Sequence, residues 1–183
     1  SLVIAYQESV GLDVGRIQTV ISEDLGQTWS WPIEASLGAP AGKHAKPTVA
    51  RGDTDKMHVV WHRQNSGDSS AWISSSVDGI EWATPAQLPT LQQEVGIKPG
   101  RQYNLHVSGV EGTLGMAPTS YMTSYDEGEN WGEATPIPVT DGAMLLAHEI
   151  EANQVEGWLH IAWWETVGGS MVVQQLMLVT VEP

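Results

Sequence analysis

The chain has 183 residues, a formal net charge of −14 and no cysteine. These values exclude disulfides and thiolate chemistry, and 8 lysines and arginines are too few for the basic surface that nucleic-acid binding requires. We therefore expect no nucleic-acid partner. No apolar run approaches the ~20 residues of a membrane-spanning helix, so we expect no membrane insertion either.

The first predicted elements are two short strands, at Leu2–Tyr6 and Arg16–Ile21. The segment Ser22–Trp29 follows them and has the residue types of a hairpin bend. An aspartate accepts hydrogen bonds from backbone N–H groups further along, and a glycine supplies a positive φ. We therefore expect Asp24 and Gly26 to form the bend, and Trp29 to start the next strand.

This segment recurs twice further along the chain. The matching positions are Ser22, Asp24, Gly26 and Trp29; Ser76, Asp78, Gly79 and Trp82; and Ser124, Asp126, Gly128 and Trp131. The three aspartates are 54 and 48 residues apart. A regular spacing of this length predicts a repeated structural unit.

Further strands fall into the same period. The second unit has strands at Lys46–Ala50, His58–Arg63 and Ala71–Ser75; the third at Tyr103–Val107, Thr113–Ala117 and Ser120–Thr123; the fourth at Ala147–Ile150 and His160–Glu165. Glycine and proline mark linkers at Gly38–Gly42 and Gly96–Gly100. The units therefore cover about residues 1–40, 41–100, 101–142 and 143–183 of a single domain or fragment.

About four strands in roughly 50 residues is the pattern of one β-propeller blade. We expect an all-β protein with about four antiparallel, four-stranded blades, the first of which lacks its innermost strand. Ring closure would hide the exposed sheet edges. Three arrangements remain open: a part of a larger propeller, a small ring closed in an unusual way, or two chains that complete one ring.

The three bends resemble the Asp-box (BNR) repeats of sialidases and related β-propellers. The resemblance implies that the Asp-box residues are structural and lie on the face away from the active site. It also implies a carbohydrate or glycoconjugate partner. Together with the acidic composition, it suggests a secreted, cell-surface or periplasmic location.

In a propeller, the starts of the innermost strands and the loops after the second strands share one face. By the predicted strands, this face gathers His44, Lys46, Arg101, Tyr103, Asn104, His148 and Glu149 with Gln7, Glu8, His62, Arg63, Trp164 and Glu165, and Lys43 lies beside His44. Cations and aromatic rings suit carboxylate pairing and sugar stacking. The predicted ligand-binding residues are His44, Lys46, His62, Arg63, Arg101, Tyr103, His148, Glu149 and Trp164. Alternatively, the polarity is only that of exposed loops.

Three functions remain open at this point. The first is a non-catalytic carbohydrate- or ligand-binding module. The second is a sialidase-type glycoside hydrolase of which this chain is an incomplete portion. Its residues would come from Arg63, Arg101, Tyr103 and Glu149, yet only 4 arginines are present and the Arg-Ile-Pro signature of the family is missing. The third is a purely structural repeat used for assembly.

The sequence predicts no cofactor and no metal. Asp53 and Asp55 could hold a structural Ca²⁺, or they form a plain turn. His58 and His160, which match in the repeat alignment, are interpreted as structural.

Overall fold

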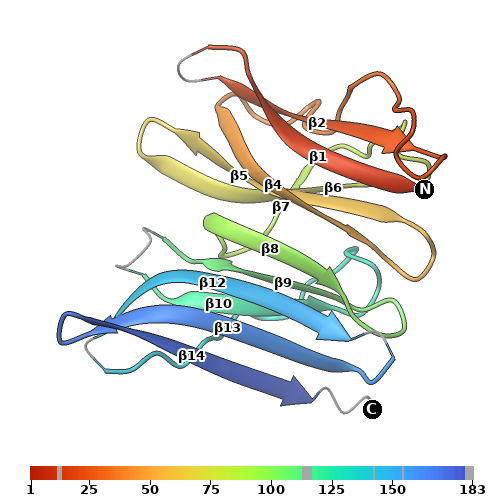
Figure 1. Cartoon of the computed structure of the whole chain (residues 1–183). Coiled ribbons are helices and arrows are strands. Elements are labelled where there is room, and N and C mark those ends of the chain that lie inside the picture. Colours follow the sequence, from red (N-terminus) through yellow and green to blue (C-terminus); the bar gives the residue numbers. More distant parts are fainter. Residues whose placement is uncertain (12–13, 113–116, 142, 154, 180–183) are drawn as a thin grey trace.

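The computed structural model describes residues 1–11, 14–112, 117–141, 143–153 and 155–179, and every regular element in this part is a β-strand (Figure 1). The strands are β1 (Leu2–Ser9), β2 (Gly15–Ser22), β3 (Ile33–Glu34), β4 (Lys43–Arg51), β5 (Met57–Asn65), β6 (Asp68–Ser76), β7 (Ala86–Gln87), β8 (Gln93–Pro99), β9 (Leu105–Val110), β10 (Thr119–Ser124), β11 (Thr135–Pro136), β12 (Met144–Asn153), β13 (Trp158–Val167) and β14 (Ser170–Val179). The expected all-β class is confirmed. Within the described residues, no helix is long and apolar enough to cross a membrane.

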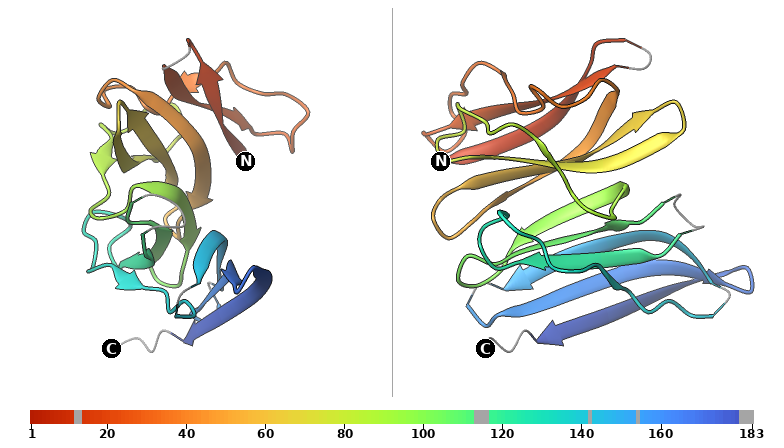
Figure 2. Two further views of the ribbon diagram at one scale, coloured as in Figure 1. Left: turned by 90° about the vertical axis from the view of Figure 1, so that its left-hand side faces the viewer. Right: turned by 180° about the vertical axis from the view of Figure 1, so that it is seen from behind.

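Consecutive strands pair antiparallel in four groups, β1–β3, β4–β7, β8–β11 and β12–β14. The first two groups are joined into one sheet by a single parallel residue pair, Gly15 with Lys43. The groups follow one another from the N-terminal to the C-terminal end of the molecule (Figures 1 and 2). The described strands do not close into a ring, and β1 stands at the edge of the first group, as expected for a unit without an innermost strand.

The third group corrects the predicted order of strands. Gln93–Pro99, part of which was interpreted as a linker, forms the innermost strand β8, and most of Tyr103–Val107 belongs to the second strand, β9. The unit boundary predicted after Gly100 is therefore wrong, because the third group begins at Gln93. The predicted strand Thr113–Ala117 lies almost wholly outside the described residues.

Gly96 has a packing role that its neighbours in the sequence do not reveal. A Cβ atom at Gly96 would lie 3.0 Å from Cγ2 of Ile150 in β12. A glycine inside a strand often marks such a close approach of two backbones. Only Val95 and Ile97 of β8 are buried apolar residues, which is too weak a pattern to distinguish a strand from a linker.

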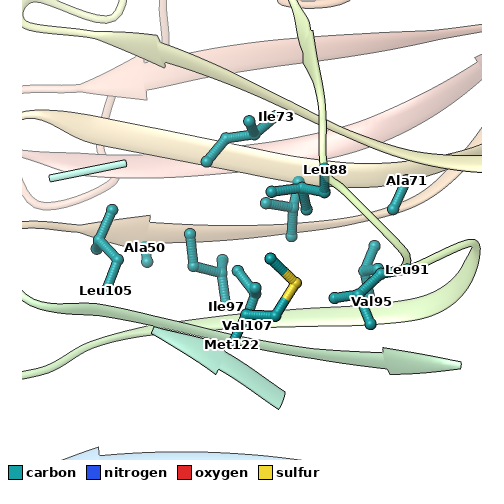
Figure 3. Close-up of a cluster of buried hydrophobic side chains, with 11 residues drawn as sticks. Ala50, Ala71, Ile73, Leu88, Leu91, Val95, Ile97, Leu105, Val107 and Met122 are labelled. Atoms are coloured by element: carbon teal, nitrogen blue, oxygen red, sulfur yellow. The ribbon is translucent and has the colours of Figure 1, made fainter. Parts of the chain in front are cut away.

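The core lies between neighbouring groups rather than inside any one of them. The largest cluster joins β4–β7 and the residues after β7 to β8–β10, and it contains Ala50, Val60, Ala71, Ile73, Leu88, Leu91, Val95, Ile97, Leu105, Val107 and Met122 (Figure 3). A second cluster around Trp61 joins the first two groups, and a third around Trp163 joins the last two. Each group thus buries its apolar side chains against the next one in the chain.

The three aspartate bends occupy equivalent places, directly after β2, β6 and β10. In the last of them, the Ser124 hydroxyl donates to Asp126 Oδ1 at 2.8 Å and accepts from the Gly128 N–H at 2.8 Å. Backbone and side-chain nitrogens of Asn130 donate to the two carboxylate oxygens of Asp126. The bends at Asp24 and Asp78 have the same serine–aspartate–glycine network.

These hydrogen bonds favour the ionised carboxylates. Bonds from the side chain and backbone of Thr28 lower the pKa of Asp24 to about 2. The pKa values of Asp78 and Asp126 are lowered for the same kind of reason. All three carboxylates therefore accept hydrogen bonds from their own bends, which is a structural role.

The tryptophans of the bends do not start the outer strands, contrary to the prediction. Those strands, β3, β7 and β11, begin four residues after Trp29, Trp82 and Trp131 respectively. The residue after each tryptophan instead makes one backbone hydrogen bond to the preceding strand, as Gly132 does to Thr123. Trp82 and Trp131 pack against core clusters, whereas Trp29 is 39% exposed.

Candidate functional site

The first strands of the last three groups are β4, β8 and β12, which we call the innermost strands, and each has a β-bulge near its start. The register shifts between Ala45 and Thr48 in β4, between Gln93 and Gly96 in β8, and between Leu145 and Ala147 in β12. Bulges of this kind redirect side chains and are common beside functional sites. The three bulges therefore indicate a candidate site at the end of the molecule where β4, β8 and β12 begin.

Two bulge residues have an unusual backbone. Lys46 and Glu94 have φ values of 52° and 49°, in the left-handed region that non-glycine residues seldom occupy. Such a conformation costs on the order of 1–3 kcal/mol and persists where the surroundings impose it. The two side chains form an ion pair that joins β4 to β8. The Lys46 side chain is 60% exposed and that of Glu94 29%, so the pair lies at the surface.

A hollow of about 320 Å³ lies on one side of this ion pair. We call it the His62 pocket; it is lined by Gln7, Lys43, Ala45, Lys46, His62, Gln64, Ser69, Gln93 and Glu94. Three of these side chains are glutamine amides, which each offer a carbonyl acceptor and two N–H donors. The pocket therefore presents several groups that can both donate and accept hydrogen bonds.

A second hollow, of about 270 Å³, lies on the other side of the ion pair. We call it the His148 pocket; it is lined by Lys46, Pro47, Thr48, Glu94, Val95, Gly96, Ser108, Ala147, His148, Glu149 and Ile150. Within the described part of the chain, the Ser108 hydroxyl and His148 Nδ1 are buried atoms without a hydrogen-bond partner. Buried polar groups are nearly always paired, so two unpaired atoms beside one hollow are unusual.

The histidines of the two pockets are held in the neutral form. Burial lowers the pKa of His62, and Lys46 and Lys43 add to this effect while Glu94 opposes it. Burial also lowers the pKa of His148, while Glu94 and a hydrogen bond with the Ser108 backbone oppose it. A neutral imidazole has one donor and one acceptor nitrogen, which suits a hydroxyl-rich ligand.

His44 and Arg63, both predicted to bind ligand, are buried beneath this end of the protein. His44 Nδ1 accepts a hydrogen bond from Trp61 Nε1 at 2.7 Å, and its Nε2 lies 3.0 Å from the Pro40 carbonyl. Arg63 donates to the Ala41 carbonyl and pairs with Asp68 at 3.1 Å. Both side chains position the loop before β4 and do not line either pocket.

Arg101, Tyr103 and Asn104 lie at the opposite end of the sheets, contrary to the predicted convergence. They belong to the turn between β8 and β9, and the seven residues of β8 span about 20 Å. The Tyr103 carbonyl accepts a hydrogen bond from the Glu127 backbone, next to the Asp126 bend. The set Arg63, Arg101, Tyr103 and Glu149 therefore does not form one catalytic site. The misplacement follows from assigning Tyr103–Val107 as an innermost strand.

The remaining predicted residues divide between these locations. Lys46, His62, His148 and Glu149 line the two pockets, as do Gln7 and Lys43. Trp164 is paired with Ala147 but lines neither pocket, and Glu165 is buried and accepts a hydrogen bond from the Thr140 backbone. Glu8 accepts a hydrogen bond from Gln18 at 3.0 Å.

The sequence interpretation missed Gln64, Ser69, Gln93, Glu94 and Ser108. One signal for Glu94 exists: Lys46 precedes Gly52 by six residues, and Glu94 precedes Gly100 by six. Gly52 and Gly100 both follow directly on the ends of innermost strands. An alignment of these glycines makes Glu94 the equivalent of Lys46 in the next group of strands.

No group of three metal-ligating side chains occurs among the described residues. Of the two aspartates considered for Ca²⁺, Asp53 accepts a hydrogen bond from the Tyr103 backbone and Asp55 pairs with Arg51 at 3.2 Å. Both carboxylates thus have protein partners at the turn between β4 and β5. His58 corresponds in register to His106 rather than to His160, since each pairs with the residue before a bend serine.

No family model matches the sequence, and no curated protein matches it either. Solved structures do match. The intramolecular trans-sialidase from Ruminococcus gnavus, in complex with oseltamivir carboxylate, has a TM-score of 0.65 and 10% identity over 100% of this chain and 42% of its own. The NanB sialidase from Streptococcus pneumoniae gives 0.58 and 12% over 95% and 49%. The Aleuria aurantia lectin, in complex with α-methyl-L-fucoside, gives 0.50 and 14% over 95% and 60%.

At these identities the likeness establishes the fold alone, which is sialidase-like and consistent with a propeller-like arrangement. The chain spans less than two thirds of the length of each of these three proteins.

Proposed function

We propose that this protein binds carbohydrate, without catalysis of its own, in the groove formed by the His62 pocket and the His148 pocket. The observation that carries the proposal is the dense set of amide, imidazole and carboxylate groups around the Lys46–Glu94 ion pair. Each such group can bond the hydroxyls of a sugar as donor, acceptor or both.

The charge balance of the groove favours an uncharged ligand. Lys43 and Lys46 are matched by Glu94 and Glu149, and the two histidines have lowered pKa values. Among the described residues that line the two pockets there is no arginine, the side chain best suited to bidentate pairing with a carboxylate ligand. A neutral, hydroxyl-rich sugar fits this composition better than the anionic sugar allowed by the sequence.

The structural neighbours support a carbohydrate ligand. They include sialidases and a lectin in complex with a fucoside. The recurring aspartate bends support a place among the Asp-box (BNR) repeat propellers, with this chain as about four units of one. In that arrangement the groove lies at the end of the sheets away from the bends.

A glycan array tests the proposal directly. We expect retention of at least one neutral glycan, and a loss of affinity of about tenfold in Gln93→Ala, because two to three hydrogen bonds at ~0.5–1.5 kcal/mol are removed. Gln27→Ala is the matched control, since Gln27 is exposed in the Asp24 bend, at the opposite end. Equal losses in both variants, or an array without a retained glycan, would contradict the proposal.

A second candidate function is glycoside hydrolysis, because two carboxylates, Glu94 and Glu149, line the His148 pocket. Glycosidases commonly act through a pair of carboxyl groups. Hydrolysis of aryl glycosides that disappears in both Glu94→Gln and Glu149→Gln, while Glu151→Gln retains it, would favour this function over binding alone. Glu151 is a suitable control because it lies further along β12, paired with Lys98 at 2.8 Å.

A further inference from the structure

The two pockets of the groove share only the ion pair between them. Among the residues that the structure describes, Lys46 and Glu94 alone line both the His62 pocket and the His148 pocket. The first pocket takes residues from β1, β4, β5, β6 and β8, and the second from β4, β8, β9 and β12. The hollows therefore follow one another across the starts of the three innermost strands.

Each pocket by itself is small. At about 320 Å³ and 270 Å³, both are near the lower limit of ~300 Å³ for small-molecule pockets. Each has room for one sugar ring and its own set of polar partners. The His62 pocket is lined by the amides of Gln7, Gln64 and Gln93, and the His148 pocket by the imidazole of His148 and the carboxylate of Glu149.

The Lys46–Glu94 ion pair lies between the two pockets, where the linkage between two bound sugar rings would lie. The Lys46 ammonium has three N–H donors and the Glu94 carboxylate has several lone pairs, so their mutual bond leaves capacity on both partners. Both residues have a left-handed backbone at the bulges, and both line the boundary between the pockets.

We infer that the groove recognises a saccharide chain of at least two sugar residues, with one ring in each pocket and the linkage over the Lys46–Glu94 ion pair. The inference rests on the proposed carbohydrate binding and specifies its ligand class. The pockets differ in hydrogen-bonding capacity, since Lys43, which only donates, lines one and Glu149, which only accepts, lines the other. This difference gives the bound chain a defined direction.

The test is an array that carries glucose, galactose, mannose, fucose and N-acetylglucosamine, each as the monosaccharide and as linear di- and trisaccharides. Isothermal titration then measures the best oligosaccharide and its component monosaccharide. We expect the disaccharide to bind at least tenfold more tightly than the monosaccharide, and the trisaccharide to add no more than about twofold.

Two variants test whether the higher affinity for the disaccharide depends on both pockets. Gln64→Ala alters only the His62 pocket and Glu149→Gln only the His148 pocket, and both side chains are exposed, so the fold should tolerate the changes. Each variant should reduce the advantage of the disaccharide to about twofold, while the Gln27→Ala control keeps it.

The outcomes separate the two proposals. If monosaccharides bind as tightly as oligosaccharides, or if the disaccharide keeps its advantage in both variants, the inference is wrong while carbohydrate binding stands. If the array retains no glycan, the proposed function fails and the inference fails with it.

Discussion

At the residue scale, Gly100 shows how tightly the turns after the innermost strands are packed. A Cβ atom there would lie 2.5 Å from Nε2 of His106, whose ring is buried beneath the turn. We expect Gly100→Ala to lower the free energy of unfolding by about 1–3 kcal/mol, as overpacking does. Urea denaturation measures this change. Gly11→Ala is the control, because a Cβ at Gly11 meets no atom within 4 Å. Equal stability of both variants would contradict the packing argument.

Ser124 provides a second test at the same scale. Its side chain is fully buried, and its hydroxyl bonds both Asp126 and the Gly128 N–H. Ser124→Ala leaves that N–H without its acceptor, and we expect a loss of about 1–3 kcal/mol in unfolding free energy. Ser170→Ala, at an exposed position in β14, should stay within about 0.5 kcal/mol of the unaltered protein. If Ser170→Ala lowered the unfolding free energy as much as Ser124→Ala, the proposed stabilisation by the bend hydrogen bonds would be contradicted.

At the element scale, the second strands β5 and β9 each bury one histidine. His58 Nδ1 lies 2.8 Å from the Ser75 hydroxyl, and His106 Nδ1 lies 2.9 Å from the Thr123 hydroxyl. Burial lowers the pKa of both to about 4, and around His58 the charge of Lys56 adds to this effect while Glu127 opposes it. The neutral rings are therefore part of the folded sheets.

These histidines predict loss of stability in mild acid. Their pKa falls from about 6.5 in the unfolded chain to about 4 in the fold, so the unfolded state binds more protons between these values. Stability is fully present above pH 6.5 and falls towards pH 4, by on the order of 3 kcal/mol for each histidine. Thermal melts across this range should give a steep slope that His106→Asn reduces. An unchanged melting temperature between pH 6.5 and 4.5 would contradict this account.

At the scale of the whole molecule, the first and last groups of strands expose apolar side chains. Leu2 and Ile4 of β1 are 45% and 47% exposed, and Met171 and Val173 of β14 are 69% and 62% exposed. These strands stand at opposite ends of the molecule (Figure 1). Since the inner groups bury such residues against their neighbours, we expect the isolated chain to self-associate at micromolar concentrations. Sedimentation velocity should then give a monomer mass for Met171→Lys combined with Val173→Lys. A monomer mass for the unaltered chain at every concentration would contradict this expectation.

Much of this architecture follows from local sequence signals. The aspartate bends are determined by residues within a few positions of one another, and strands such as β5 and β13 are evident from short apolar runs. β8 could not be recognised, because Gly96 serves contact with β12 rather than a turn. The Lys46–Glu94 pair depends on how two sheets stack, and its residues are 48 positions apart in the chain. The sequence therefore predicted those site residues that lie at the ends of correctly assigned strands, and it did not predict the contact between two groups of strands.

The most direct test of the central claim is a nuclear magnetic resonance titration of the isotope-labelled protein with the tightest glycan from the array. We predict that backbone and side-chain amide shifts concentrate on Gln64, Gln93, Glu94 and Ala147, at the bulged starts of the innermost strands. Shifts concentrated instead on the turn from Pro99 to Asn104, or on the aspartate bends, would contradict the claim that the groove around Lys46 and Glu94 is the binding site.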